Sequence, residues 1–219
     1  MISIILTLIG IAGLFFFAQS EKDSMARYQV KTLLMAISLF LINRMFVADN
    51  QIGLRGDLTA AAPGLGFLGF PKESTWRSVT PTFLIIPFLV TVFVVYLQTL
   101  KGKKFKFSTL ISALGISLIL SILNSLTEEI IFRVIAIEGL SDSWSPKLIA
   151  IICGIWFGIP HYFGNPGKVP GVVMATFLGW VSAKSMLETN GIAFAWLLHY
   201  IQDVPIIAML ILAKRPTKL

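Results

Sequence analysis

Two adjacent glutamates and an arginine lie within a strongly apolar segment of the chain. The stretch 127–133 reads TEEIIFR and follows the apolar run 110–126. Ionisable side chains at this depth in a membrane cost roughly 2.5–3.5 kcal/mol on insertion scales, so they normally face the protein interior, pair with one another and mark a functional site. If the segment is helical, Glu129 and Arg133 are one turn apart, and the arginine neutralises that acid. Glu128, about 100° further round the helix, is then the acid left to handle a proton or a water molecule.

The two histidines of the chain also lie in apolar segments. His161 follows Phe157 by four residues, and Asp203 follows His199 by four. Residues at this spacing share a helix face, so Asp203 can orient the His199 imidazole and fix which nitrogen carries its proton. A single intramembrane histidine is as often a hydrogen-bonded packing residue as a functional one. Phe157 alone fits a core position, and Asp203 alone could cap a helix broken at Pro205.

The set as a whole is harder to explain by packing. It places two glutamates, two histidines, an arginine and an aspartate on three apolar segments, where each charge is costly. We therefore predict one shared site formed by these three segments.

Composition places the chain among polytopic membrane proteins. Charged residues make up 13% and apolar residues 56% of the 219 residues, and the mean hydropathy is +0.82, whereas a soluble domain is about 25% charged. The net charge of +7 does not indicate nucleic-acid binding, because the basic residues gather in short loops and near the C-terminus, where membrane topology explains them. Cys153 is the only cysteine, which excludes an intrachain disulfide.

Seven apolar segments predict an all-α bundle of about seven transmembrane helices, with six or eight as alternatives. We interpret the first as a retained span, because no charged region precedes it and no small-x-small cleavage site is clear. The second has about 16 residues against the usual 20, so we expect it to be tilted or extended at one end. The predicted segments are 1–18, 32–47, 80–100, 110–137, 147–163, 169–186 and 191–213.

A long loop and a glycine pattern add to this prediction. The longest non-spanning region, 49–78, is rich in glycine and proline, and we favour an interfacial loop over a re-entrant element. Gly154 and Gly158 form a G-x-x-x-G pattern, which lets another helix approach closely, within the monomer or in a dimer.

Basic residues predict the orientation. The stretch 101–106, KGKKFK, is the strongest cytoplasmic marker, and with seven spans it predicts an outer N-terminus and a cytoplasmic C-terminus. Glu128 then lies about 30 Å along its helix from this stretch, nearer the outer face than His161. Either the helices are staggered or the orientation is reversed.

The ordered patterns E-E-x-x-x-R, F-x-x-x-H and H-x-x-x-D resemble the three signature motifs of the CPBP family. This family contains the CAAX prenyl proteases and their prokaryotic relatives, including bacteriocin-processing and self-immunity proteins. The similarity covers about 108–213, which divides the chain into N-terminal spans (1–106), a catalytic membrane core (107–213) and a basic tail (214–219). Asp203 departs from the asparagine of many members, and a carboxylate is a poorer donor to an oxyanion.

The resemblance implies an intramembrane peptidase. In that scheme Glu128 activates water together with His161, and His199 and Asp203 support the oxyanion. The supporting residues are Glu129, Arg133 and Phe157.

A zinc ion bound by Glu128, His161 and His199 is the rival arrangement, with the three protein ligands typical of catalytic zinc. The sequence lacks H-E-x-x-H, and Arg133 close to the carboxylates disfavours a dication, so we favour a scheme without metal or other cofactor.

The expected partners are membrane lipid and a membrane-associated or lipidated peptide substrate, in a prokaryotic cell membrane. Two other function classes remain open. One is a non-catalytic immunity or adaptor protein of the same family. The other is a proton- or ion-coupled transporter, which the absence of a visible inverted repeat disfavours.

Overall fold

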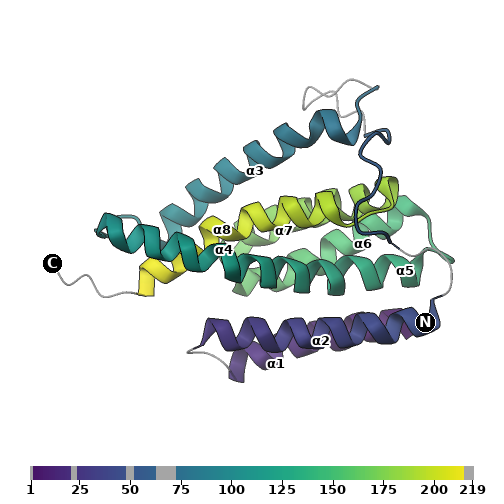
Figure 1. The fold of residues 1–219 in the computed structure, drawn as a ribbon, viewed down its shortest axis with the longest axis horizontal. Helices are drawn as coiled ribbons and strands as arrows, with labels where there is room; N and C mark the ends of the chain where they lie inside the picture. The colour runs from purple at the N-terminus through teal and green to yellow at the C-terminus, as the bar shows by residue number, and fades with distance from the viewer. Residues whose placement is uncertain (1, 21–23, 48–51, 63–72, 215–219) are drawn as a thin grey trace.

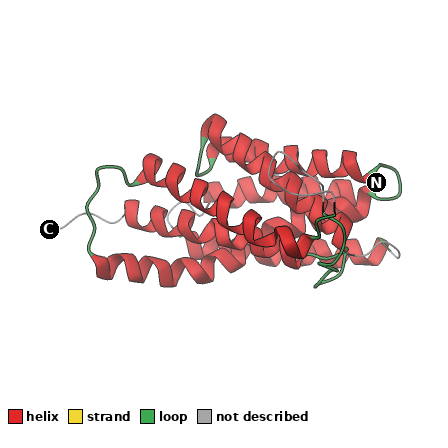
Figure 2. Cartoon of the chain, turned by 90° about the horizontal axis from the view of Figure 1, so that it is seen from above, coloured by secondary structure: helices red, strands yellow, loops and turns green. Residues whose placement is uncertain are grey.

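The computed structural model describes residues 2–20, 24–47, 52–62 and 73–214. Helices account for most of these residues, and the described part of the chain contains no strand apart from two isolated bridges (Figure 2). In chain order the elements are α1 (Ile2–Ser20), α2 (Met25–Phe46), α3 (Trp76–Thr99), α4 (Phe107–Glu129), the π-turn η2 (Ile130–Val134), α5 (Ile135–Leu140), α6 (Pro146–Gly158), the 3₁₀ turn η3 (Ile159–Phe163), α7 (Lys168–Thr189) and α8 (Ala193–Lys214).

Within the described residues, six helical segments are long and apolar enough to cross a membrane. The longest is the continuous run from α4 through η2 to α5, Phe107–Leu140. The sixth predicted segment, 169–186, corresponds to α7, which is less apolar and packs between α6 and α8. The predicted all-α polytopic membrane bundle is confirmed.

The helices are arranged around the pair α4 and α8, which pack along one another (Figure 1). The α1–α2 hairpin covers one side of α4, η2 and α5. On the other side, α6 packs on α7, and α7 contacts α8. Helix α3 packs mainly on α8 and leans away from the rest of the bundle.

Helix α2 is longer than the sequence indicated. It begins at Met25 and runs for 22 residues, so the short predicted segment is extended at its N-terminal end, one of the two expected possibilities. Ser24 caps it, since the serine hydroxyl accepts a hydrogen bond from the backbone N of Arg27 at 3.4 Å. The polar residue Gln29 is buried against the bundle instead of lying in a loop.

The fourth segment is also longer than predicted, and the expected loop 138–146 begins only after Leu140. Glu138 stays inside the helix because its buried carboxylate accepts two hydrogen bonds and forms an ion pair. Asn43 Nδ2 lies 2.8 Å from Oε2, while the backbone N of Ile52 and Nη2 of Arg44 each lie 2.9 Å from Oε1. Arg44, near the C-terminal end of α2, is therefore the ion-pair partner of Glu138.

The described start of the long loop, 52–62, packs on the turn between α7 and α8. The backbone N of Gly53 donates to Asn190 O at 3.0 Å, and that of Asp57 donates to Thr189 O at 2.7 Å. The Asp57 carboxylate is exposed, and hydrogen bonds from the hydroxyl and backbone N of Thr59 lower its pKa. This half of the loop is held on the outside of the bundle.

The glycine- and proline-rich centre of the loop, 63–72, lies outside the described residues, as do residues 215–219 of the predicted basic tail. The choice between a re-entrant and an interfacial loop therefore remains a prediction.

Helices α6 and α7 approach closely at the G-x-x-x-G pattern, as the sequence predicted. A Cβ atom on Gly154 would lie 2.9 Å from Thr176 O, and one on Gly158 would lie 2.9 Å from Thr176 Cβ. Both distances are shorter than van der Waals contact. The pattern serves packing within one chain, and it brings the end of α6 against α7 next to the histidine turn.

We predict that Gly158→Ala destabilises the protein. The added methyl group would collide with the side chain and the backbone N of Thr176, and overpacking of this kind costs about 1–3 kcal/mol. Denaturant unfolding in detergent measures the loss. Gly115→Ala on α4 is the matched control, because its Cβ would meet no atom within 4 Å. Equal stability of the two variants would contradict this packing.

Candidate active site

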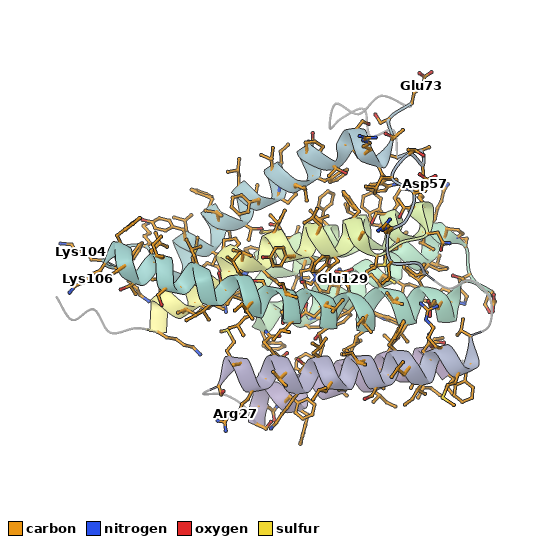
Figure 3. The ribbon with its side chains drawn as sticks, in the orientation of Figure 1. Arg27, Asp57, Glu73, Lys104, Lys106 and Glu129 are labelled. Atoms are coloured by element: carbon orange, nitrogen blue, oxygen red, sulfur yellow. The ribbon has the colours of Figure 1, made fainter. Side chains whose placement is uncertain are left out.

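The three predicted motifs converge on the His199 imidazole. Its Nδ1 donates a hydrogen bond to Glu129 Oε1 at 2.8 Å. Its Nε2 lies 3.5 Å from Glu128 Oε2 and 3.5 Å from Asp203 Oδ1. Glu129 lies midway along the bundle in Figure 3, between its two ends. Helices α4 and α8 thus bring three carboxylates to one buried histidine.

The Glu129–Arg133 pair is confirmed and is entirely enclosed by the protein. Arg133 Nη1 lies 3.2 Å from Glu129 Oε1, and both side chains have 0% exposure. Between them the backbone widens into the π-turn η2, a local insertion that is frequent at functional sites. The pair therefore sits where α4 loses its regular geometry.

Phe157 supports Arg133 from α6. The centre of the guanidinium lies 3.7 Å from the centroid of the Phe157 ring, within the range of a cation–π contact. Gly179 on α7 leaves the space that this stack occupies, since a Cβ there would lie 3.0 Å from Phe157 Cβ and 3.2 Å from Arg133 Nη2. The arginine is thus enclosed by an aromatic face and a glycine.

Phe157 also contacts both histidines. Its ring centroid lies 4.5 Å from that of His161 and 5.2 Å from that of His199. The backbone O of Phe157 accepts a hydrogen bond from His161 Nδ1 at 2.7 Å. Because a carbonyl can only accept, Nδ1 carries the proton, and in the neutral ring Nε2 keeps its lone pair.

Glu128 differs from Glu129 in its access to a cavity. Its side chain is 14% exposed, and within the described structure no group donates a hydrogen bond to its Oε2. Together with Tyr28 and His161 it lines a cavity of about 250 Å³ between α1, α2, α4 and η3. A cavity of this size accommodates several water molecules, at about 30 Å³ each.

A second cavity, of about 190 Å³, lies on the other side of His161. It is bounded by α3, α7 and α8, and its lining is mostly apolar, with His161, His199 and Asp203 at one end. His161 therefore lies between an apolar cavity and the cavity that contains Glu128.

The long α4 run and the short helix α6 are staggered along the bundle, so residues at different distances from their helix ends meet at one level. Glu128 and His161 line the same cavity although the first lies deep in the long α4 run and the second follows the short helix α6. In Figure 3 the basic residues Lys104 and Lys106 mark one end of the bundle and Glu73 the other. The acid pair lies between them, at membrane depth.

Sequence reasoning missed three residues at the site. Asn124 donates from Nδ2 to Asp203 Oδ2 at 3.0 Å, and Gln29 donates from Nε2 to Asn124 Oδ1 at 3.0 Å. Asn124 precedes Glu128 by four residues, and that spacing was a usable signal. Gln29 and Tyr28 were missed because their segment was predicted to be a loop.

The rival zinc set is not assembled in the described part of the chain, where no three His, Cys, Asp or Glu side chains are grouped to hold a metal ion. His199 Nδ1 bonds Glu129 and His161 Nδ1 bonds a backbone carbonyl, which leaves the Nε2 atom of each ring available to a ligand. The Arg133 guanidinium beside Glu129 adds a positive charge that opposes a dication.

A family comparison decides the identity of the chain. The profile described as type II CAAX prenyl endopeptidase Rce1-like matches residues 79–204, more than half of the chain. The chain belongs to this Rce1-like family. Comparison with curated proteins and with solved structures finds no match.

The Rce1-like match runs from α3 through most of α8 and contains all three motifs. Membership identifies the chain as an integral membrane protein of a peptidase family. The α1–α2 hairpin lies outside the matched residues, yet it forms one wall of the cavity that contains Glu128.

We predict that Arg133→Met is strongly destabilising in this Rce1-like protein. It leaves the Glu129 carboxylate buried without its cation, and breaking a buried ion pair costs about 3–5 kcal/mol. Adding Glu129→Gln removes the unpaired charge and should restore much of the loss. Unfolding in detergent compares the single and double variants. A double variant less stable than Arg133→Met would show that the pair does not act as a unit.

Proposed function

We propose that this protein is an intramembrane endopeptidase that hydrolyses a peptide bond of a membrane-associated or lipidated peptide with water activated by Glu128. One observation carries the proposal. Of the two adjacent glutamates, only Glu128 reaches a cavity, while Glu129 is held by Arg133 and His199. Membership of the Rce1-like family supports the reaction class.

Glu128 is suited to act as the general base. The Glu128 carboxylate is partly exposed and lines the cavity, so it can accept a hydrogen bond from water there and then take its proton. The resulting hydroxide attacks the carbonyl carbon of the substrate, and the proton is passed to the amine that leaves. His161 Nε2 has the lone pair needed to hold the same water, because Nδ1 is bonded to Phe157 O.

His199 is suited to stabilise the oxyanion that forms on the substrate. Its Nδ1 bond to Glu129 fixes the ring, and its Nε2 faces Glu128 and Asp203. Because Nδ1 already carries a proton, Nε2 can donate only when the ring is an imidazolium, and in that form it is a preorganised donor that stabilises charge developing in the transition state. Asp203, as a carboxylate, accepts from Asn124 and therefore serves to orient the imidazole.

The two cavities suit a substrate with one polar and one apolar part. The cavity at Glu128 holds water and the scissile bond, and the apolar cavity beyond His161 receives hydrocarbon. We propose that the end of the bundle that carries Lys104, Lys106 and the C-terminal end of α8 faces the cytoplasm, in accordance with the positive-inside rule (Figure 3).

The decisive variant is Glu128→Gln, which keeps the shape of the side chain and removes the base. A general base accelerates a reaction by about 10²–10⁴-fold, so the rate of peptide cleavage should fall by at least about 100-fold. Purified protein is assayed on a library of membrane-embedded and farnesylated reporter peptides, each with and without a strong chelator. Glu188→Gln on α7 is the matched control, since Glu188 binds Lys184 and Trp76 away from the site.

Cleavage that is lost in Glu128→Gln and unaffected by chelator is the expected result. Loss on chelation that zinc restores would assign the reaction to a metallopeptidase. Cleavage by Glu128→Gln at the wild-type rate would refute the base. If Glu128→Gln loses cleavage but keeps full activity in a biological immunity assay, that activity does not depend on catalysis, as expected of an adaptor.

A further inference from the structure

A chain of two amides lies behind the site and connects α2, α4 and α8. Gln29 Nε2 donates to Asn124 Oδ1 at 3.0 Å, and Asn124 Nδ2 donates to Asp203 Oδ2 at 3.0 Å. The remaining Asp203 oxygen, Oδ1, lies 3.5 Å from His199 Nε2. One carboxylate oxygen of Asp203 thus faces the amide chain and the other faces the imidazole.

The Asp203 carboxylate determines which end of each amide bond donates and which accepts. A carboxylate can only accept, so Asn124 must present its nitrogen to Asp203 and its oxygen to α2. Gln29 meets that oxygen with its own nitrogen. The carboxylate thus sets the orientation of Asn124, and Gln29 Nε2 satisfies the Asn124 oxygen that then faces α2.

We propose that Gln29 and Asn124 are positioning residues that fix the Asp203 carboxylate with Oδ1 toward His199. Neither of them touches the reacting atoms. They act through Asp203 on the His199 imidazole, which, under the proposed function on which this inference rests, supports the oxyanion. Without the amide chain, Asp203 can rotate and His199 loses one of its three carboxylate neighbours.

This assigns a role to the N-terminal hairpin, which lies outside the residues matched by the Rce1-like profile. Gln29 is almost completely buried at 4% exposure on α2, and polar groups in such a position are normally retained only with a hydrogen-bond partner. Through Gln29 the hairpin contributes to the geometry of the site as well as to the cavity wall.

The first test uses the fact that the chain has only two histidines. With labelled histidine, the imidazole nitrogen resonances of His161 and His199 can be followed separately by NMR. Asn124→Leu, which keeps the volume and removes both hydrogen bonds, should shift the His199 signals and leave those of His161 in place. Gln29→Leu should produce a smaller shift of the same kind, because Asn124 can still donate.

The same variants are then assayed for peptide cleavage. Loss of a hydrogen bond to a charged group changes a rate or equilibrium constant by about 10- to 100-fold. We therefore expect kcat of Asn124→Leu to fall by that factor while KM is nearly unchanged. Ser125→Ala is the matched control: Ser125 is buried on the same helix, and its hydroxyl donates to the backbone O of Ser121. It should alter neither kcat nor the His199 signals.

An exchange of the two groups tests the contact itself. Asn124→Asp places a second carboxylate against Asp203 and should lower the unfolding temperature. Adding Asp203→Asn restores the hydrogen bond with donor and acceptor exchanged, so the double variant should unfold near the wild-type temperature. A double variant no more stable than Asn124→Asp would overturn the proposed contact.

The outcomes separate this inference from the proposed function. Unchanged His199 signals in Asn124→Leu would overturn the positioning role, even if wild-type protein cleaves peptides. A shift of these signals in a protein that cleaves none of the reporters would support the role and count against the peptidase assignment. An equal fall in kcat in Asn124→Leu and Ser125→Ala would show that any disturbance of α4 slows cleavage. That result would also overturn the positioning role.

Discussion

Charge can be kept inside an apolar helix bundle only where it is paired, and the buried pair Glu129–Arg133 is the interaction on which this site depends. The π-turn, the Phe157 ring and the small residue Gly179 all make room for the guanidinium or contact it. The same Glu129 oxygen accepts from His199 Nδ1. One ion pair therefore joins α4, α6 and α8, the three helices that carry the motifs.

The pair also explains how two neighbouring glutamates come to have different environments. Glu129 is completely enclosed, and its charge is balanced by Arg133. Glu128, one position earlier on the helix, points to another face and reaches the cavity between α1, α2 and η3. A change of about 100° round the helix thus separates a residue that holds the site together from one that can meet water.

Helix α2 is held to the core at two points by polar contacts. At one point Gln29 reaches Asn124, and at the other Asn43 and Arg44 reach Glu138 beyond the π-turn. Apolar packing against lipid-like surfaces gives little preference for one helix position over another, whereas hydrogen bonds across helices do. These contacts fix the α1–α2 hairpin relative to the long α4 run, and so fix the wall of the cavity at Glu128.

The sequence by itself determined the class of fold and the members of the acid and histidine set. Long apolar runs can only be membrane helices, and charges within them must find partners, so Glu129 could be paired with Arg133 from their spacing alone. Tertiary structure decided what spacing along one helix cannot express. Asn124 and Gln29 meet Asp203 only because three helices pack together, and the staggering of α6 against α4 alone brings His161 to the cavity of Glu128. The contact of Arg44 on α2 with Glu138 on α5 could not be predicted either, because the pairing of distant segments depends on how helices pack and not on local periodicity.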